Sequence, residues 1–161
     1  MRRMKIYLDT SVINYLDAPN SPDKMNDTLL LWERLVNNPP CDVVISEIFL
    51  KEIVDCSEPK RSFMFGQLNA IQYELVSKTS EVTQLAEQYV DYGVLSRNHY
   101  SDLLHIAHAA IYDCHSVLSW NFRHFVNFKT MDRVNAVHLI IGYNPIRIAS
   151  PSMILGEFEN E

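Results

Sequence analysis

Short apolar runs alternate along the chain with longer segments of helical periodicity. The apolar runs are rich in residues that favour strands, and they occupy residues 5–8, 43–45, 73–76, 117–119 and 146–148. Helical patterns occupy residues 23–36, 47–56, 60–71, 80–92, 102–113 and 129–141. Strands that alternate with helices are joined by crossovers, which makes them parallel. The pattern therefore predicts an α/β fold, a three-layer α/β/α sandwich around a five-stranded parallel sheet.

The predicted sheet directs attention to one of its edges. In open parallel sheets, ligands bind at the carboxyl ends of the strands, where the strand order reverses. We expect the strand at 117–119 to neighbour the strand at 5–8 at that point. The helix at 102–113 is apolar on nearly all sides, so we place it against the sheet with little exposed surface. Polar residues just after the first and fourth strands are therefore the first candidates for a site.

Length and composition indicate one domain over residues 1–161, since 161 residues at 47% hydrophobic and 21% charged suffice for a single core. The four glycines lie too far apart for either phosphate-binding glycine motif.

Three widely spaced cysteines without a C-x-x-C pair favour a reducing compartment. Asp9 interrupts the apolar run after the basic N-terminus, and no apolar stretch approaches the ~20 residues of a bilayer span. We expect a soluble cytoplasmic protein with no membrane partner.

The net charge argues against a protein that attracts nucleic acid by its overall charge. The chain carries 14 Lys and Arg against 20 Asp and Glu, a formal net charge of −6. That argument weakens if some of the acids bind cations. Residues 119–147 also carry four basic residues against the single acid Asp132. Three of these, Arg123, Lys129 and Arg133, could form a local positive surface, although solvated helix charges explain them equally well.

Asp9 directly follows the first strand. Its carboxylate is either an N-cap for the next helix or a ligand at the edge of the sheet, and taken alone the two interpretations are about equal. Thr10 and Ser11 could cap that helix equally well. Their presence would leave Asp9 free to point into the crevice.

Two glutamates share the helix predicted at 47–56, and their neighbours distinguish them. Glu47 precedes Lys51 by four residues, the favourable spacing for a solvated pair, so we assign it to the surface. Glu52 borders the apolar stripe formed by Ile48 and Phe49 and is turned towards the interior. A carboxylate there needs a partner such as Arg or Lys, because an unpaired buried charge is costly. We favour a site role for Glu52 over an edge residue that reaches water.

Asp102 opens the apolar helix at 102–113. Negative charge in a first helical turn is stabilised by the helix dipole, so capping is the simpler interpretation, although Ser101 could cap by itself. His105 shares the face of Asp102 and could hydrogen-bond near a site there. The H-x-x-H spacing of His105 and His108 resembles a metal motif only superficially, and we expect both to be packed histidines.

Asn121 lies just after the fourth strand, and we expect it close to Asp9. An Asn at the start of a loop is usually a turn residue, but its oxygen could also complete a cation shell. Asp9, Glu52, Asp102 and Asn121 would together suit a hard divalent cation such as Mg²⁺ or Mn²⁺, because these ions prefer oxygen donors, whereas zinc favours His or Cys. Such a site suits phosphodiester hydrolysis.

Four segments in this order resemble the PIN-domain nucleases, especially the toxins of VapBC-type toxin–antitoxin systems. The segments are residues 5–12 (KIYLDTSV), 45–53 (ISEIFLKEI), 102–107 (DLLHIA) and 119–122 (SWNF). The resemblance extends from about residue 4 to residue 148. In this family the first, second and third acids would correspond to Asp9, Glu52 and Asp102, while Asn121 stands where many members have Asp.

The resemblance implies a five-stranded parallel sheet between helices and a Mg²⁺- or Mn²⁺-dependent endoribonuclease site at Asp9, Glu52, Asp102 and Asn121. It also implies a toxin of a type II toxin–antitoxin system, an RNA substrate, an antitoxin that binds near the site, and a homodimer. Asn121 departs from the family pattern, since a neutral ligand weakens cation affinity.

Two other functions remain as alternatives. Asn121 and the acidic net charge also fit a non-catalytic or weakly active PIN-like module that binds RNA or a protein partner. Phosphate transfer on an aspartyl nucleophile fits poorly. Haloacid-dehalogenase-like phosphatases carry a second Asp where this chain has Ser11, and receiver domains carry a Lys where it has Arg147.

Overall fold

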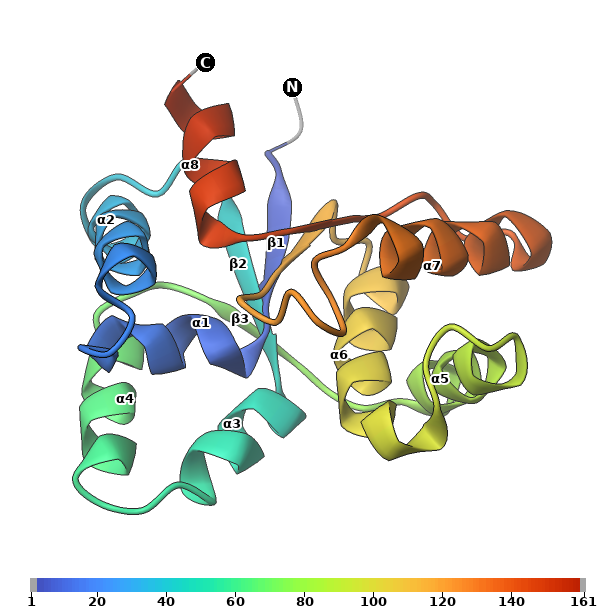
Figure 1. The fold of residues 1–161 in the computed structure, drawn as a ribbon, viewed down its shortest axis with the longest axis horizontal. Coiled ribbons are helices and arrows are strands. Elements are labelled where there is room, and N and C mark those ends of the chain that lie inside the picture. The colour runs from blue at the N-terminus through green and yellow to red at the C-terminus, as the bar shows by residue number, and fades with distance from the viewer. Residues whose placement is uncertain (1–2, 160–161) are drawn as a thin grey trace.

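A five-stranded parallel sheet runs through the middle of the computed structural model, which describes residues 3–159 (Figure 1). Its strand order is β3-β2-β1-β4-β5. The strands are β1 (Lys5–Leu8), β2 (Asp42–Ser46), β3 (Glu74–Val76), β4 (Ser116–Leu118) and β5 (Arg147–Ala149). All five predicted strands form, and their ends lie within about one residue of the predicted positions. The expected parallel sheet is confirmed.

The six predicted helices also form, with ends that differ by a few residues. They are α2 (Pro22–Asn37), α3 (Glu47–Val54), α4 (Lys60–Leu68), α5 (Ser80–Asp91), α6 (Tyr100–Ile111) and α7 (Phe128–Ile141). The prediction did not include the helix α8 (Pro151–Glu159), nor the bounds of α1 (Thr10–Asn14) and the 3-10 turns η1 (Tyr15–Asp17) and η2 (Arg97–His99). α8 packs on α2 and buries Ile154 and Phe158.

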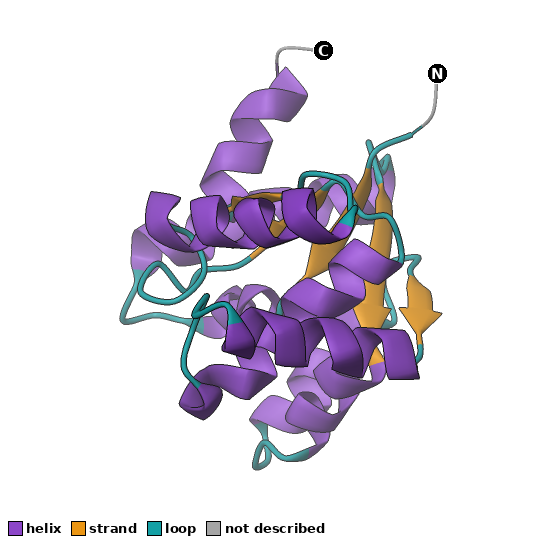
Figure 2. Ribbon diagram, turned by 90° about the vertical axis from the view of Figure 1, so that its right-hand side faces the viewer, coloured by secondary structure: helices purple, strands orange, loops and turns teal. Residues whose placement is uncertain are grey.

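Side chains alternate between the two faces of the sheet, so that each face has its own hydrophobic core. In β1, Ile6 and Leu8 contribute to one core and Tyr7 to the other. The Ile6 side of the sheet is covered by α1, α2, α3, α4 and α8, and the Tyr7 side by α5, α6 and α7 (Figures 1 and 2). This arrangement is the three-layer α/β/α sandwich that the sequence predicts.

The central strand β1 separates the two halves of the sheet. β2 and β3 lie on one side of it, and β4 and β5 on the other. Leu8 pairs with Leu118, and the N–H of Asp9 extends the ladder by donating to the carbonyl of Leu118 at 2.9 Å. The carboxyl ends of β1 and β4 are therefore adjacent, as expected, and the residues that follow them meet at the point where the strand order reverses.

α6 packs closely against the sheet. Every residue from Leu103 to Ala109 is buried, which confirms the expectation that this helix lies against the sheet with little exposed surface.

No helix within residues 3–159 is both long enough and apolar enough to span a bilayer.

Candidate functional site

The carboxylate of Asp9 lies at the carboxyl edge of the sheet and is only 6% exposed. Asp9 occupies the N-cap position of α1, but its side chain does not cap the helix. Its Oδ2 instead accepts hydrogen bonds from the hydroxyls of Ser11, at 2.7 Å, and Ser119, at 2.8 Å. The expectation that Thr10 or Ser11 caps this helix is wrong, because both lie inside α1. The side chain of Asp9 therefore makes no capping bond to α1, and the two serines hold its carboxylate instead.

Ser11 and Ser119 also connect Asp9 to the loop after β4. Ser11 Oγ accepts the N–H of Trp120 at 2.9 Å, and Ser119 Oγ accepts the N–H of Asn121 at 3.0 Å. The two serines therefore fix the orientation of Asp9 and the path of this loop together. Sequence reasoning did not assign them this role, since a hydroxyl after a strand has many uses.

Glu52 is held by His105 rather than by the Arg or Lys that the sequence suggested. Glu52 lies on α3 with its side chain 37% exposed, and its Oε1 is 2.5 Å from Nε2 of His105. The same nitrogen is 3.7 Å from Oδ1 of Asp9. His105 is buried, as predicted, but it is also the basic partner that joins two of the candidate acids.

A chain of hydrogen bonds continues from His105 into the sheet. Nδ1 of His105 lies 2.6 Å from the hydroxyl of Tyr7, which lies 2.7 Å from the hydroxyl of Ser46. Ser46 also caps α3 by accepting the N–H of Phe49 at 3.4 Å. The orientation of the imidazole, and through it that of Glu52, is therefore set by the residues of β1 and β2.

Charge within this group shifts the pKa of both partners. Burial alone would lower the pKa of His105, but the hydrogen bond to Glu52 and the nearby carboxylates, Asp9 foremost, raise it above its ordinary value. Burial opposes ionisation of Glu52, yet its hydrogen bond to His105 holds its pKa below the usual range. Both shifts favour the ion pair between an imidazolium and a carboxylate.

Asp102 is half-buried in the first turn of α6. The helix begins at Tyr100, so Ser101 lies inside it and the expected Ser101 cap is wrong; the N-cap position belongs to His99, whose side chain makes no capping bond. Burial, and after it the charge of Asp9, raises the pKa of Asp102 to about 6, and Glu52 adds to the effect. The three predicted acids therefore interact at one edge of the sheet.

The side-chain oxygen of Asn121 is used in a turn. Its Oδ1 accepts the N–H of His124 at 2.9 Å. This is the turn role, one of the two roles that the sequence allowed; the other was a cation ligand.

His108 is a packed histidine, as expected: it is buried, and its Nδ1 donates to the carbonyl of Leu104 at 2.7 Å.

Glu47 is exposed, as predicted. Over the described residues, it makes no ion pair with Lys51, so the surface position is confirmed without the suggested pairing.

The acids do not form a ready-made cation shell. In the part of the chain that the structure describes, no three His, Cys, Asp or Glu side chains are grouped in a way that could hold a metal ion. The contacts above explain this, because His105 holds Glu52 while two hydroxyls hold one oxygen of Asp9.

A basic hollow of about 480 Å³ opens beside this edge. It is lined by Arg123, Lys129 and Arg133 together with Phe122, His124 and Asn127. The ring of His124 contacts that of His99, with centroids 3.8 Å apart and planes tilted by 33°. Nδ1 of His99 is 4.0 Å from Asp102. The basic residues that the sequence singled out therefore share one surface that reaches towards Asp102.

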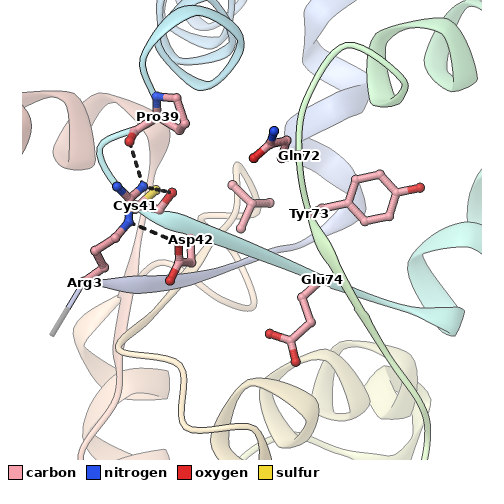
Figure 3. A pocket seen from close by; sticks show the side chains of 8 residues that line it. Arg3, Pro39, Cys41, Asp42, Gln72, Tyr73 and Glu74 are labelled. Carbon is pink, nitrogen blue, oxygen red and sulfur yellow. Dashed lines mark hydrogen bonds and ion pairs between the residues drawn. The ribbon is translucent and has the colours of Figure 1, made fainter.

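A second hollow lies at the opposite edge of the sheet, near the amino ends of β1, β2 and β3 (Figure 3). Its volume is about 270 Å³. Arg3 reaches across one wall and donates to the carbonyls of Pro39 and Cys41 and to the carboxylate of Asp42. Because these contacts occupy the guanidinium, this hollow is a structural junction, distant from the predicted acids.

No protein-family model and no curated protein matches the sequence. Among solved structures, a chain of VapBC2 from Rickettsia felis, crystallised with a DNA fragment from its promoter, is similar with a TM-score of 0.55. It is 20% identical, and the match covers 91% of this chain and 98% of that one. A chain of DNA-bound VapBC from Salmonella typhimurium is 18% identical with a TM-score of 0.56, covering 92% and 98%. The chain thus has the three-layer fold that the PIN-domain resemblance implies, and it shares that fold with chains of two VapBC complexes.

Proposed function

We propose that this chain is a divalent-metal-dependent endoribonuclease that hydrolyses RNA phosphodiester bonds. The observation that carries the proposal is the interaction of Asp9, Glu52 and Asp102, which come from three separate segments and meet at the carboxyl edge of the sheet. His105 contacts both Asp9 and Glu52, and the pKa of Asp102 is raised by burial first, then by the charge of Asp9 and less by that of Glu52. Such a group of acids at the place where open α/β sheets bind ligands is more readily explained by a site than by stability.

The donor types, carboxylate and amide oxygens, are those that a hard cation prefers, although within residues 3–159 they are not grouped as a metal site. Asp9 and Glu52 face the imidazole of His105, and Asp102 lies 4.0 Å from that of His99. Burial first, and then the charge of Asp9, raise the pKa of Asp102, so a cation beside it would relieve an unfavourable negative charge. Mg²⁺ or Mn²⁺ would be held by Asp9, Glu52 and Asp102, and by Asn121 if its oxygen leaves the turn. When bound, such an ion polarises a water nucleophile and stabilises charge that develops on the phosphate.

The surrounding residues orient the acids and bind the substrate. His105 donates its Nε2–H to Glu52, and the hydroxyls of Ser11 and Ser119 hold Asp9. The basic hollow of Arg123, Lys129 and Arg133 offers a place for the RNA backbone, although the chain as a whole is acidic.

The same proposal extends to partners. Both similar structures are named as VapBC complexes bound to DNA, and we infer that this chain is the toxin of a type II pair whose antitoxin binds near the site. We further infer a cytoplasmic homodimer built from a single domain over residues 1–161.

A binding module without catalysis is the second candidate. It is favoured by the contact between His105 and Glu52, which occupies an acid that the cation would need, and by the turn that uses Asn121. Metal uptake separates the two candidates, because a binding module need not take up Mn²⁺ near Asp9.

Purified protein should cleave single-stranded RNA in the presence of Mn²⁺ and take up the ion in titration calorimetry. Asp9→Asn and Asp102→Asn should each abolish cleavage and weaken Mn²⁺ uptake while circular dichroism shows an intact fold. The matched control is Asp91→Asn, an exposed acid at the end of α5, which should change neither. Undiminished cleavage by the two site variants would exclude the nuclease, and an inert wild-type protein without Mn²⁺ uptake would favour the binding module.

A further inference from the structure

Three aromatic rings surround the ammonium group of Lys24. Nζ of Lys24 lies 5.0 Å from the ring centroid of Phe122, 5.6 Å from that of Tyr15 and 5.8 Å from that of Trp120. The rings also contact one another, since Trp120 lies 5.8 Å from Tyr15 and meets Phe122 edge-on at 6.0 Å. A cation over several ring faces is attracted by their quadrupoles. These four residues, which we call the Lys24 cluster, come from η1, α2 and the loop after β4.

The Lys24 cluster is rigid on its inner side. Trp120 is only 4% exposed, and its Nε1–H donates to Thr28 Oγ1 at 2.8 Å. Thr28 donates in turn to the carbonyl of Lys24 at 2.6 Å. The loop after β4 is therefore fixed to α2 through a buried hydrogen bond.

The Lys24 cluster lies next to Asp9. The N–H of Trp120 donates to Ser11 Oγ, which itself donates to Asp9. Phe122 follows two residues later, past Asn121, whose N–H is held by the second hydroxyl that binds Asp9. A ligand on Phe122 would therefore be adjacent to the carboxyl edge where the three acids meet.

Phe122 also borders the basic hollow. Its side chain is 44% exposed, and it lines the hollow together with Arg123, Lys129 and Arg133. An exposed ring between cations on two sides is the arrangement by which proteins bind single-stranded nucleic acid, because a base stacks on the ring while the phosphates contact the cations. A folded protein core gains nothing from leaving this ring in water.

The ammonium of Lys24 is available for such a contact. Within residues 3–159, no carboxylate lies within ion-pair distance of Lys24 and its Nζ makes no hydrogen bond. Its three N–H donors therefore remain for an oxygen ligand, while the rings hold the group in place.

We propose that Phe122 and Lys24 form a binding site for one unpaired nucleotide of single-stranded RNA, with the base stacked on Phe122 and its phosphate at Lys24. The strand then continues from Phe122 into the basic hollow. This inference rests on the proposed function and specifies how its substrate is held.

The test measures RNA binding without cleavage. A short fluorescein-labelled single-stranded RNA of mixed sequence is titrated with protein in the presence of a chelator, and anisotropy gives Kd. Phe122→Ala should raise Kd about five- to hundredfold without changing its salt dependence, because stacking carries no charge. Lys24→Gln should reduce the slope of log K against log salt by about 0.7, the value for one lost phosphate contact on a single strand. The RNA annealed to its complement should bind more weakly than the single strand.

A tryptophan at the same position tests stacking directly. Phe122→Trp should keep the affinity and show fluorescence quenching on addition of RNA. The matched controls are Leu139→Ala and Leu139→Trp. Leu139 is an apolar residue that is 86% exposed and lies near the C-terminal end of α7. The first should leave Kd unchanged, and the second should show no quenching.

The outcomes separate this inference from the proposed function. If the wild-type protein cleaves RNA with Mn²⁺ but Phe122→Ala binds as tightly as wild type, the stacking site is excluded and the nuclease stands; Phe122 would then be a contact for a protein partner. If the protein does not cleave but Phe122→Ala weakens binding, the nuclease fails and the stacking site stands. Absence of any RNA binding by the wild-type protein also overturns the inference.

Discussion

His105 Nε2 lies 2.5 Å from Glu52 Oε1, a contact that joins α6 to α3 across the carboxyl edge of the sheet. The imidazole is 1% exposed, whereas the carboxylate reaches solvent. The pair therefore has a buried base and an accessible acid. A cation that binds Glu52 through Oε1 would therefore have to replace its contact with His105.

The first prediction concerns the stability that His105 provides. His105→Gln removes the positive charge and the contact with Tyr7, and it should lower the free energy of unfolding by about 2–4 kcal/mol near neutral or slightly acidic pH. The pKa of His105 is raised on folding, so its contribution is fully present below the unfolded pKa of about 6.5 and is lost as pH rises through the folded pKa. Urea unfolding at several pH values should show the loss shrinking as pH increases. A loss that grows with pH would contradict the assignment.

The second prediction is that Asp102 destabilises the metal-free protein. Its pKa is raised from 3.8 to about 6 by burial and by Asp9, so the ionised form is disfavoured in the folded state. Asp102→Asn should therefore increase the free energy of unfolding at neutral pH by roughly 1–2 kcal/mol. The advantage should shrink as pH falls through about 6 and vanish below about 4. Thermal unfolding measures this difference, and Asp91→Asn provides the exposed control; a lower Tm for Asp102→Asn would contradict it.

The third prediction concerns the hydroxyl of Tyr7, which links His105 to Ser46. Tyr7→Phe keeps the ring in the core but leaves buried polar atoms without this partner, so it should lower stability by about 1–2 kcal/mol. Tyr112→Phe is the matched control, because the hydroxyl of Tyr112 donates to the carbonyl of Ser77 at an exposed position. Chemical denaturation should show a clearly smaller effect for the control.

The fourth prediction is that two buried histidines titrate in opposite directions. Burial lowers the pKa of His138, although its hydrogen bond to the carbonyl of Asn144 partly opposes the effect, while the acids around His105 raise its pKa. The neutral His138 accepts a hydrogen bond from Tyr89 at 2.5 Å. Its stabilising contribution is present above the unfolded pKa of about 6.5 and is lost as pH falls through its folded pKa.

Nuclear magnetic resonance of the imidazole protons measures both titrations in one sample. Signals are assigned by their loss in His138→Asn and His105→Gln. A midpoint for His138 above that of His105 would contradict the structure.

The elements of the sheet were predictable because they leave simple patterns. Each strand is a short apolar run, and the alternation of strands with helices determines that the strands are parallel. α8 was missed because it is short and follows the last strand, and its helical character depends on burial of Ile154 and Phe158 against α2. Such tertiary packing leaves little local signal.

The candidate acids were predictable from position, but their partners were not. Asp9 and Glu52 were identified from the end of a strand and the border of an apolar stripe. Nothing local indicates that His105, 53 residues from Glu52, would supply the base, or that Lys24 would lie among rings from the loop after β4. These contacts depend on how separate segments pack, and one sequence carries no record of that pairing.

The two hydroxyls on Asp9 come from distant parts of the chain, since Ser11 is two positions away from it and Ser119 is 110 positions away. During synthesis, a ribosome-bound fragment that stops before β4 lacks Ser119, Trp120 and Phe122. It therefore lacks one of the two hydroxyls that hold Asp9 and two of the three rings around Lys24. The carboxyl edge of the sheet is thus completed only after the fourth strand has been synthesised and has docked beside the first.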